Sequence, residues 1–499
     1  MSAFRSAEVL VSISKAATFR NILYTSAGKG LTLSCTALTG LVVARNLTST
    51  DYGVIGFALI VIGFLNQFSD MGLGNAVVRR LELSSESLQT AFTLKVVLSC
   101  GAFAIALLIA PFARHLFDHP ATGNVVRILA LNFLVSTVGF VPQALLTREM
   151  NYRALVIPAI IGAIMQCTLA VTLVLHGWSY WAVIIGSVGG TLISGVAMQL
   201  MKRLPLRLRF DRRDAQEYLR FGIPLFGTGV LVFVIFNLDN FLVGTSMGSA
   251  KLGYYALAFT WGSFICVLLT ATVNNVLFPA FSAIQHDPLA VRRWYLKTVD
   301  LVAFVAVVAN TALIANAHFF LVTLLGKGTG KWVPAEMTLR ILCLYGILRA
   351  VTEPLSPCLM ARGRTRAILR AAMIAGALEL GLLLLALRWG RVELIAWAVL
   401  TAYGSQLIIY LPVIRQEFSI EAVDLVATVW PAIPAMAAGC LITSLLPVSF
   451  GTTFVTLALR GMFTASVVGL THGVSSRFRC FHEIRGMISE NFNREVRTA

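Results

Sequence analysis

The sequence has little charge. Charged side chains make up 13% of its 499 residues, about half of the roughly 25% that soluble domains carry. Acidic residues are the scarcest, because 23 Asp and Glu stand against 40 Lys and Arg, which gives a net charge of +17. Hydrophobic residues make up 57% of the chain and the mean hydropathy is +0.80. This composition excludes a soluble domain and predicts an all-α, polytopic membrane protein, because helices satisfy their own backbone hydrogen bonds in lipid.

The sequence also lacks the motifs of metal, disulfide and catalytic sites. Its eight cysteines stand singly, and no HExxH, CxxC or nucleophile-elbow motif occurs. Residues 326–332 (GKGTGKW) look like a phosphate-binding loop, but Leu325 replaces the first glycine and Trp332 replaces the Ser or Thr that holds magnesium. We therefore expect no enzyme activity, no cofactor and no metal. Nucleic-acid binding is not expected either, because the basic residues cluster in short loops between apolar runs.

Fourteen apolar runs are long enough to cross a hydrocarbon core of about 30 Å as helices. The first, near residues 23–43, lacks the small-residue cleavage pattern of a signal peptide, so we interpret it as a retained span. The predicted spans lie near residues 23–45, 54–78, 88–112, 124–146, 154–176, 179–201, 221–243, 252–278, 299–323, 336–360, 367–388, 392–414, 425–447 and 452–475.

Loops rich and poor in lysine and arginine alternate along the chain. The rich loops include Arg79 with Arg80, the connector from Lys202 to Arg220, and the C-terminal tail. Basic loops stay in the cytoplasm, so this pattern predicts a multi-pass protein with both termini cytoplasmic.

The longest basic connector divides the chain, with six spans before it and eight after it. The turns at 45–58 (RNLTSTDYGVIGFA) and 243–258 (VGTSMGSAKLGYYALA) resemble each other, and each places a glycine, Gly53 or Gly253, at the start of a span. This predicts two pseudo-symmetric six-helix bundles related by an axis along the membrane normal. The predicted domains are an N-lobe at 1–201, a basic cytoplasmic linker at 202–220, a C-lobe at 221–415, two further spans at 416–476 and a cytoplasmic tail at 477–499.

Several runs, in a shared order and spacing over about residues 15–415, carry a family resemblance. The chain resembles the bacterial polysaccharide transporters, the oligosaccharide flippases of the superfamily that includes the multidrug extruders. The runs are 44–80 (ARNLTSTDYGVIGFALIVIGFLNQFSDMGLGNAVVRR), 141–155 (VPQALLTREMNYRAL), 176–186 (HGWSYWAVIIG), 218–244 (YLRFGIPLFGTGVLVFVIFNLDNFLVG), 252–258 (LGYYALA), 276–287 (VLFPAFSAIQHD), 324–351 (LLGKGTGKWVPAEMTLRILCLYGILRAV) and 361–367 (ARGRTRA).

The resemblance implies a flippase that carries undecaprenyl-diphosphate-linked oligosaccharide units to the periplasmic leaflet for lipopolysaccharide or exopolysaccharide assembly. It also implies alternating access driven by a proton or sodium ion, with membrane lipids and a polysaccharide polymerase and export machinery as partners. Two alternatives share the fold: a flippase for the peptidoglycan lipid precursor and a drug or cation antiporter. Cations inside the predicted spans favour an anionic substrate over a cationic drug.

Three charges lie at similar depth in the first three predicted spans: Lys29, Asp70 and Lys95. A charge within a span is unfavourable and is kept where a partner neutralises it or a water-filled cavity solvates it. Lys29 is a candidate for binding the diphosphate, because relatives in the family carry a cation there, or else it snorkels to the interface. Lys95 has the same two interpretations. Asp70 either forms a structural ion pair with one of these lysines or exchanges a proton and competes with substrate for them.

A second set of charges lies in the C-lobe. Arg349 falls near the middle of a span, Glu353 follows at i+4, and Glu379 falls in the next span. An arginine at mid-depth cannot easily reach the interface, so we expect it to pair with Glu353 or Glu379. Its planar fork also suits a phosphate. Arg349 is therefore either a structural partner or a substrate-binding residue, and the two glutamates are either structural or involved in ion coupling.

Overall fold

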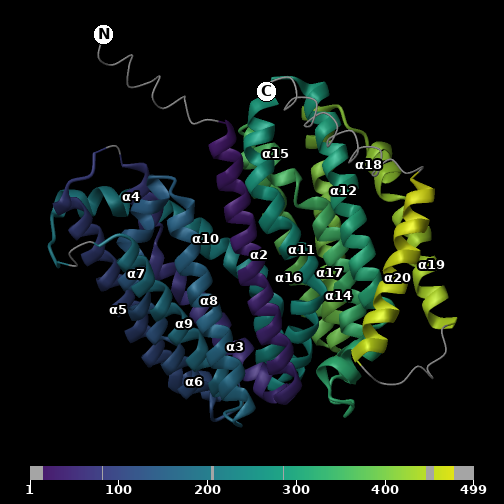
Figure 1. The fold of residues 1–499 in the computed structure, drawn as a ribbon, viewed down its shortest axis with the longest axis horizontal. Coiled ribbons are helices and arrows are strands. Elements are labelled where there is room, and N and C mark those ends of the chain that lie inside the picture. The colour runs from purple at the N-terminus through teal and green to yellow at the C-terminus, as the bar shows by residue number, and fades with distance from the viewer. Residues whose placement is uncertain are drawn as a thin grey trace. The chain divides into compact units, whose positions relative to one another are not determined.

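The computed structural model describes residues 15–80, 82–117, 119–203, 207–284, 286–445 and 454–476 (Figure 1). These residues form helices and no strand, and twelve helical segments among them are long and apolar enough to cross a membrane. The predicted all-α, multi-pass membrane fold is therefore confirmed. The predicted cytoplasmic tail at 477–499 and the N-terminal residues 1–14 lie outside the described residues.

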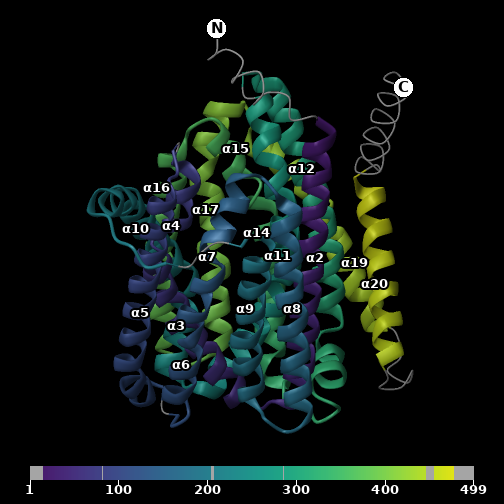
Figure 2. The same cartoon turned by 60° about the vertical axis from the view of Figure 1, so that its left-hand side comes forward.

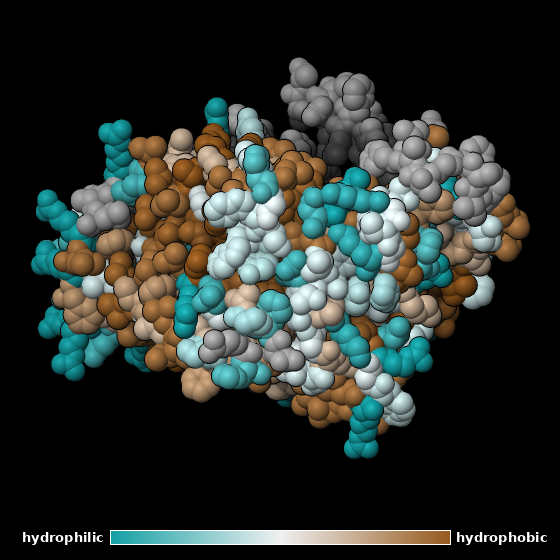
Figure 3. Space-filling model, turned by 90° about the horizontal axis from the view of Figure 1, so that it is seen from below, coloured by the Kyte–Doolittle hydropathy of each residue, from teal (hydrophilic) through white to brown (hydrophobic). Residues whose placement is uncertain are grey.

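Large apolar side chains are exposed along the spans. Leu108 and Phe112, for example, are 70% and 73% exposed. Figure 3 shows apolar residues over much of one face, with hydrophilic residues gathered between them. Extended exposed apolar surface is typical of a protein that faces lipid.

The first of two compact units comprises residues 1–253. In it α2 packs on α8, and α8 on α9 (Figure 2), while α3, α5 and α7 pack successively. Its helices are α2 (Lys15–Asn46), α3 (Ser49–Asp70), α4 (Leu73–Arg79), α5 (Ser85–Leu116), α6 (Thr122–Leu129), α7 (Leu131–Arg148), α8 (Tyr152–Leu175), α9 (Tyr180–Met201) and α10 (Arg212–Met247).

The second unit comprises residues 254–499. Here α14 packs on both α12 and α17, and α19 and α20 lie side by side in Figures 1 and 2. Its helical elements are α11 (Ser249–Ile284, which begins in the first unit), α12 (Pro288–Ala315), α13 (Ala317–Phe319), η1 (Phe320–Leu325), η2 (Val333–Ala335), α14 (Glu336–Thr352), α15 (Leu355–Ala361), α16 (Thr365–Leu387), α17 (Val392–Phe418), α18 (Ala422–Val429), α19 (Ala432–Leu445) and α20 (Phe454–Ser475).

The count of fourteen spans is not confirmed by the described residues. The predicted spans near 336–360 and 452–475 are not among the twelve long apolar segments. The first of them is interrupted: α14 is 17 residues long, and α15 starts only after Glu353 and Pro354. Proline has no backbone N–H to donate, so it ends the run of helical hydrogen bonds here.

The boundary between the two compact units falls after Gly253, whereas the predicted N-lobe ends at residue 201 and the predicted C-lobe begins at 221. The difference arises from α10, which follows the basic connector and packs on α3, α4 and α5. Tyr218 of α10 is buried in the same cluster as Leu73, Val77 and Phe92. The lobe boundaries based on span number stay a prediction.

The two similar turns noted in the sequence touch each other, and all the residues involved lie within 1–253. A Cβ placed on Gly53 would lie 1.8 Å from the carbonyl oxygen of Ser249, and one on Gly253 would lie 1.9 Å from that of Ser49. The contact is thus reciprocal, and each glycine lets the first turn of one helix approach the backbone of the other.

We expect Gly53→Ala and Gly253→Ala each to lower the free energy of unfolding by about 1–3 kcal/mol, because the added methyl overlaps a backbone atom that cannot rotate away. Thermal unfolding in detergent measures the loss. Gly40→Ala is the matched control, since a Cβ there meets nothing within 4 Å in α2. Equal stability of all three variants would contradict the reciprocal contact.

Candidate functional site

Lys95 and Asp70 form an ion pair at the C-terminal end of α3. The Lys95 side chain is 5% exposed and its Nζ lies 3.7 Å from Asp70 Oδ1, while the Asp70 side chain is 55% exposed. Lys95 Nζ also donates hydrogen bonds to the Ser69 carbonyl oxygen at 2.9 Å and to Ser69 Oγ at 3.2 Å. The structure thus places the lysine inside the bundle and its carboxylate partner at the bundle surface.

A break in the span explains why a cation is held there. Met71 and Gly72 have positive φ angles of 38° and 66°, so α3 stops at Asp70 and α4 starts afresh at Leu73. The last carbonyl groups of a helix have no partner within the helix and carry partial negative charge. Lys95 therefore stabilises the end of α3 through both a hydrogen bond and charge.

Lys29 is not part of the ion pair between Lys95 and Asp70. It is exposed on α2, which packs on α8, where Gly28 approaches Val156. No ion pair within the described ranges includes Lys29. Of the three charges predicted to share one layer, the structure joins Asp70 and Lys95.

Arg349 pairs with Glu353 in the second unit, one of the two partners predicted for it. Arg349 Nε donates to Glu353 Oε1 at 3.0 Å, and both side chains are 17% exposed. Arg349 Nη1 also donates to the hydroxyl of Tyr345 at 3.3 Å. Glu379 lies on α16 and is half-buried.

Tyr345 connects this pair to two further aromatic side chains. The Tyr345 ring meets Tyr403 of α17 edge-on with centroids 5.2 Å apart, and it lies 5.7 Å from the ring of Phe259 of α11. Tyr345 precedes Arg349 by one helical turn, so the sequence spacing alone indicates that the two side chains are neighbours. Tyr403 and Phe259 are distant in the sequence and no signal pointed to them. Arg349 is thus bonded to Tyr345, whose ring packs against two further rings, near the point where α14 ends.

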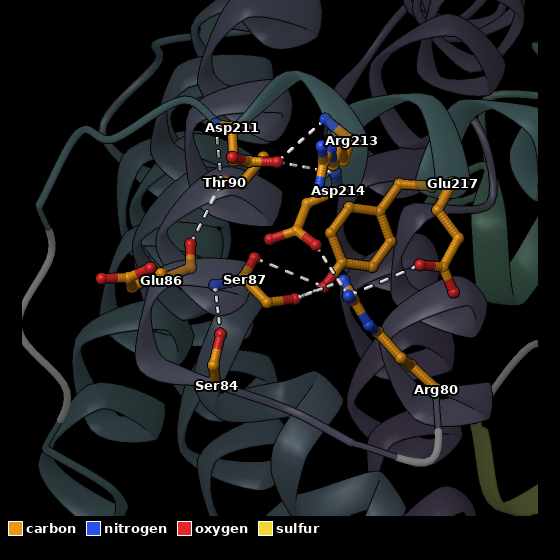
Figure 4. Close-up of polar contacts among 10 residues, drawn as sticks. Arg80, Ser84, Glu86, Ser87, Thr90, Asp211, Arg213, Asp214 and Glu217 are labelled. Atoms are coloured by element: carbon orange, nitrogen blue, oxygen red, sulfur yellow. Dashed lines mark hydrogen bonds and ion pairs between the residues drawn. The ribbon is translucent and has the colours of Figure 1, made fainter.

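A third polar cluster fixes the first turns of α10 against the loop between α4 and α5 (Figure 4). Arg80 forms ion pairs with Asp214 at 2.7 Å and with Glu217 at 3.5 Å. Its Nη1 donates to Ser87 Oγ at 2.6 Å, and the Ser87 hydroxyl lies 2.5 Å from that of buried Tyr218. The sequence had indicated Arg80 only as a marker of topology.

Asp211 caps the N-terminus of α10 in the same cluster (Figure 4). Its carboxylate accepts hydrogen bonds from the backbone N–H groups of Asp214 and Arg213, and these bonds lower the pKa of Asp211. The charged carboxylate is the better hydrogen-bond acceptor. The cap therefore contributes its full stability at pH values above the ordinary pKa of an aspartate, and this contribution is lost as the pH falls through the lowered pKa of Asp211.

The long apolar helices define a multi-pass helical membrane protein in which two predicted spans are interrupted beside an ion pair, and solved structures share the fold. The chain is similar to the lipid II flippase MurJ, with 13% identity, a TM-score of 0.73 and 91% and 99% of the two chains covered. It is also similar to an inward-facing multidrug resistance MATE family transporter, with 15% identity, a TM-score of 0.60 and 75% and 93% covered.

The family follows from the sequence match. The model of the family described as "Polysaccharide biosynthesis protein" matches residues 42–335, and the chain belongs to this family. Among curated relatives, it is 24% identical to the lipopolysaccharide biosynthesis protein WzxC of Escherichia coli strain K12, over 65% of each chain. It is 25% identical to the teichuronic acid biosynthesis protein TuaB of Bacillus subtilis strain 168, over 59% of this chain and 61% of that one. The matches therefore span less than two thirds of these relatives' lengths.

Proposed function

We propose that this protein is a flippase, not an enzyme, that translocates undecaprenyl-diphosphate-linked oligosaccharide units across the bacterial inner membrane for surface or exopolysaccharide assembly. Family membership supports this, as does the similarity to the succinoglycan biosynthesis transport protein ExoT of Rhizobium meliloti strain 1021, with 23% identity over 76% of each chain. The transporter fold supports a translocating protein.

The observation that carries the proposal is the Arg349 cluster. An arginine among spans favours an anionic ligand, and its fork matches two phosphate oxygens. Tyr403 and Phe259 are half-buried beside Tyr345, the hydrogen-bond partner of Arg349, and have flat apolar faces of the kind that pack on sugar rings. A lipid-linked sugar diphosphate has both features. Lys29, exposed on α2, and Lys95 are the proposed further contacts with substrate, of which Lys95 is the more enclosed.

Ion coupling is proposed for the carboxylates of Asp70, Glu353 and Glu379. Asp70 and Glu353 each neutralise a cation that substrate also attracts, so protonation or sodium binding there would release the cation. Glu379 is the third candidate. Both termini are proposed to be cytoplasmic, on the strength of the basic loops, and a polysaccharide polymerase and export machinery are proposed to act on the product.

Deletion of the gene tests the function. We expect lipid-linked oligosaccharide to accumulate on the inner leaflet and surface polysaccharide to be lost. When the deletion strain is complemented with the Lys29→Gln variant, we expect little polymer, because the exposed cation is removed without disturbing a packed partner. Complementation with Arg388→Gln, a change at an exposed span end, should restore the polymer fully. Lipid extraction and polymer staining measure both. Normal polymer with Lys29→Gln would contradict the role of Lys29, and an unchanged lipid pool in the deletion would contradict the function.

The same extract separates the alternatives. Accumulation of the peptidoglycan lipid precursor would favour that substrate, which the fold shared with MurJ accommodates. A drug or cation antiporter would leave both lipid pools unchanged. Lys29, which is exposed and outside every ion pair of the described residues, disfavours a cationic substrate by direct repulsion, whereas Asp70 and Glu353 neutralise Lys95 and Arg349.

A further inference from the structure

A pocket of about 910 Å³ lies between α4 and the first turns of α10, and no role described so far uses it. Its polar part comes from arginines and glutamates, and its apolar part from aromatic and aliphatic side chains of α10 and α4. It is lined by Ala76, Arg79, Arg80, Glu82, Glu217, Tyr218, Arg220, Phe221, Pro224 and Leu225, all within the first unit.

Two of the three arginines are available to a ligand. Arg80 is engaged by Asp214 and Glu217, as Figure 4 shows. Arg79 and Arg220 are exposed, and neither takes part in any ion pair within the described part of the chain. The guanidinium of Arg79 lies 4.7 Å above the centre of the Phe221 ring, which orients it without neutralising it.

The two elements that form the walls of the pocket are joined by packing and by ion pairs. Tyr218 is 1% exposed and packs in the cluster of Leu73, Val77 and Phe92, and the Arg80 ion pairs hold α10 against the loop after α4. Arg79 and Arg220 therefore project from two elements whose relative position is fixed. A preorganised pair of cations binds an anion with less loss of conformational entropy than two free side chains.

We propose that this pocket is a docking site for the diphosphate head of a polyprenyl-linked lipid, at the predicted cytoplasmic surface and separate from the Arg349 cluster. This proposal rests on the proposed function and the predicted topology. Arg79 and Arg220 each bind one of two adjacent phosphates, and Pro224 and Leu225, further along α10 toward the membrane, contact the start of the hydrocarbon chain.

Charge and size favour a diphosphate over a simple phospholipid head. Two arginines outside any ion pair of the described residues, Arg79 of α4 and Arg220 of α10, match two linked phosphates, whereas one phosphate engages one fork. The pocket is also at the upper end of the range of roughly 300–1,000 Å³ typical of ligand pockets, which leaves room for a sugar beyond the phosphates. Glu82 lines the same pocket and opposes an anion, so it sets a limit on affinity.

The test uses the full chain in nanodiscs, with undecaprenyl diphosphate as the probe and undecaprenyl monophosphate and phosphatidylglycerol as competitors, measured by native mass spectrometry. We expect Arg79→Gln with Arg220→Gln to reduce retention of the diphosphate by about 100-fold, because each arginine that is removed weakens binding roughly tenfold. Arg212→Gln with Arg213→Gln, an equal change in charge at exposed side chains outside the pocket, should leave it unchanged. Glu82→Gln should tighten it.

Equal retention by the two double variants would overturn the site. So would equally strong binding of phosphatidylglycerol, because the pocket would then be a general contact with anionic lipid. A different result would contradict the proposed function: a deletion strain that accumulates no lipid-linked oligosaccharide, whatever the pocket binds in nanodiscs.

Discussion

Arg349→Met is expected to lower the free energy of unfolding by about 3–5 kcal/mol, because it leaves the carboxylate of Glu353 largely buried without its cation. Folded protein in the membrane should fall accordingly, and surface polysaccharide with it. Thermal unfolding in detergent and the amount of full-length protein in membranes measure the loss of stability.

The double variant Arg349→Met with Glu353→Gln separates folding from transport. With both charges gone, the buried pair is replaced by neutral groups of similar size, and stability should return close to that of the parent protein. If Arg349 binds substrate, this folded variant still makes no surface polysaccharide. Normal polymer from the double variant would show that the pair is structural only.

At the ion pair between Asp70 and Lys95, Asp70→Asn is expected to lower stability more than Lys95→Met does. It leaves Lys95, which is 5% exposed, with neutral partners only, and should lower the free energy of unfolding by up to about 3 kcal/mol. Lys95→Met should be milder, because the carboxylate that it leaves behind is 55% exposed and can be solvated.

The pair Asp70→Asn with Lys95→Met again serves as the control and should recover most of the folded protein. Ser99→Ala tests the neighbouring hydrogen bond between the Ser69 and Ser99 hydroxyls, 2.9 Å apart, and should have a smaller effect of about 1 kcal/mol. An Asp70→Asn protein that is fully abundant but inactive would contradict a structural role and would favour ion coupling at Asp70.

Both ion pairs share one structural setting. Lys95 meets the end of α3, where the backbone turns at Met71 and Gly72, and Arg349 lies in the last turn of α14, before Pro354. At each place a cation is paired with a carboxylate near a helix C-terminus, and Lys95 also donates to a carbonyl oxygen there. Interrupted spans of this kind are where transporters coordinate ions and substrates, which makes these two breaks the first places to test by mutation.

The sequence by itself determined the fold class and the position of most spans, because a bilayer permits few backbone structures and demands long apolar helices. It also placed charges within predicted spans, and of the two partners predicted for Arg349, Glu353 at i+4 is the one that the structure pairs with it. The sequence showed that the turns at Gly53 and Gly253 are similar, but not that the two turns contact each other.

In the first unit, tertiary structure alone decided which charges meet. Lys29, Asp70 and Lys95 have similar predicted depths, but depth along a helix says nothing about which face a side chain occupies or which helix lies opposite. Packing of α2 on α8 leaves Lys29 exposed, while the break after Asp70 and the position of α5 bring Lys95 to Ser69. The rings around Arg349 and the arginine pocket on α10 likewise depend on contacts between segments far apart in the chain, which no local pattern specifies.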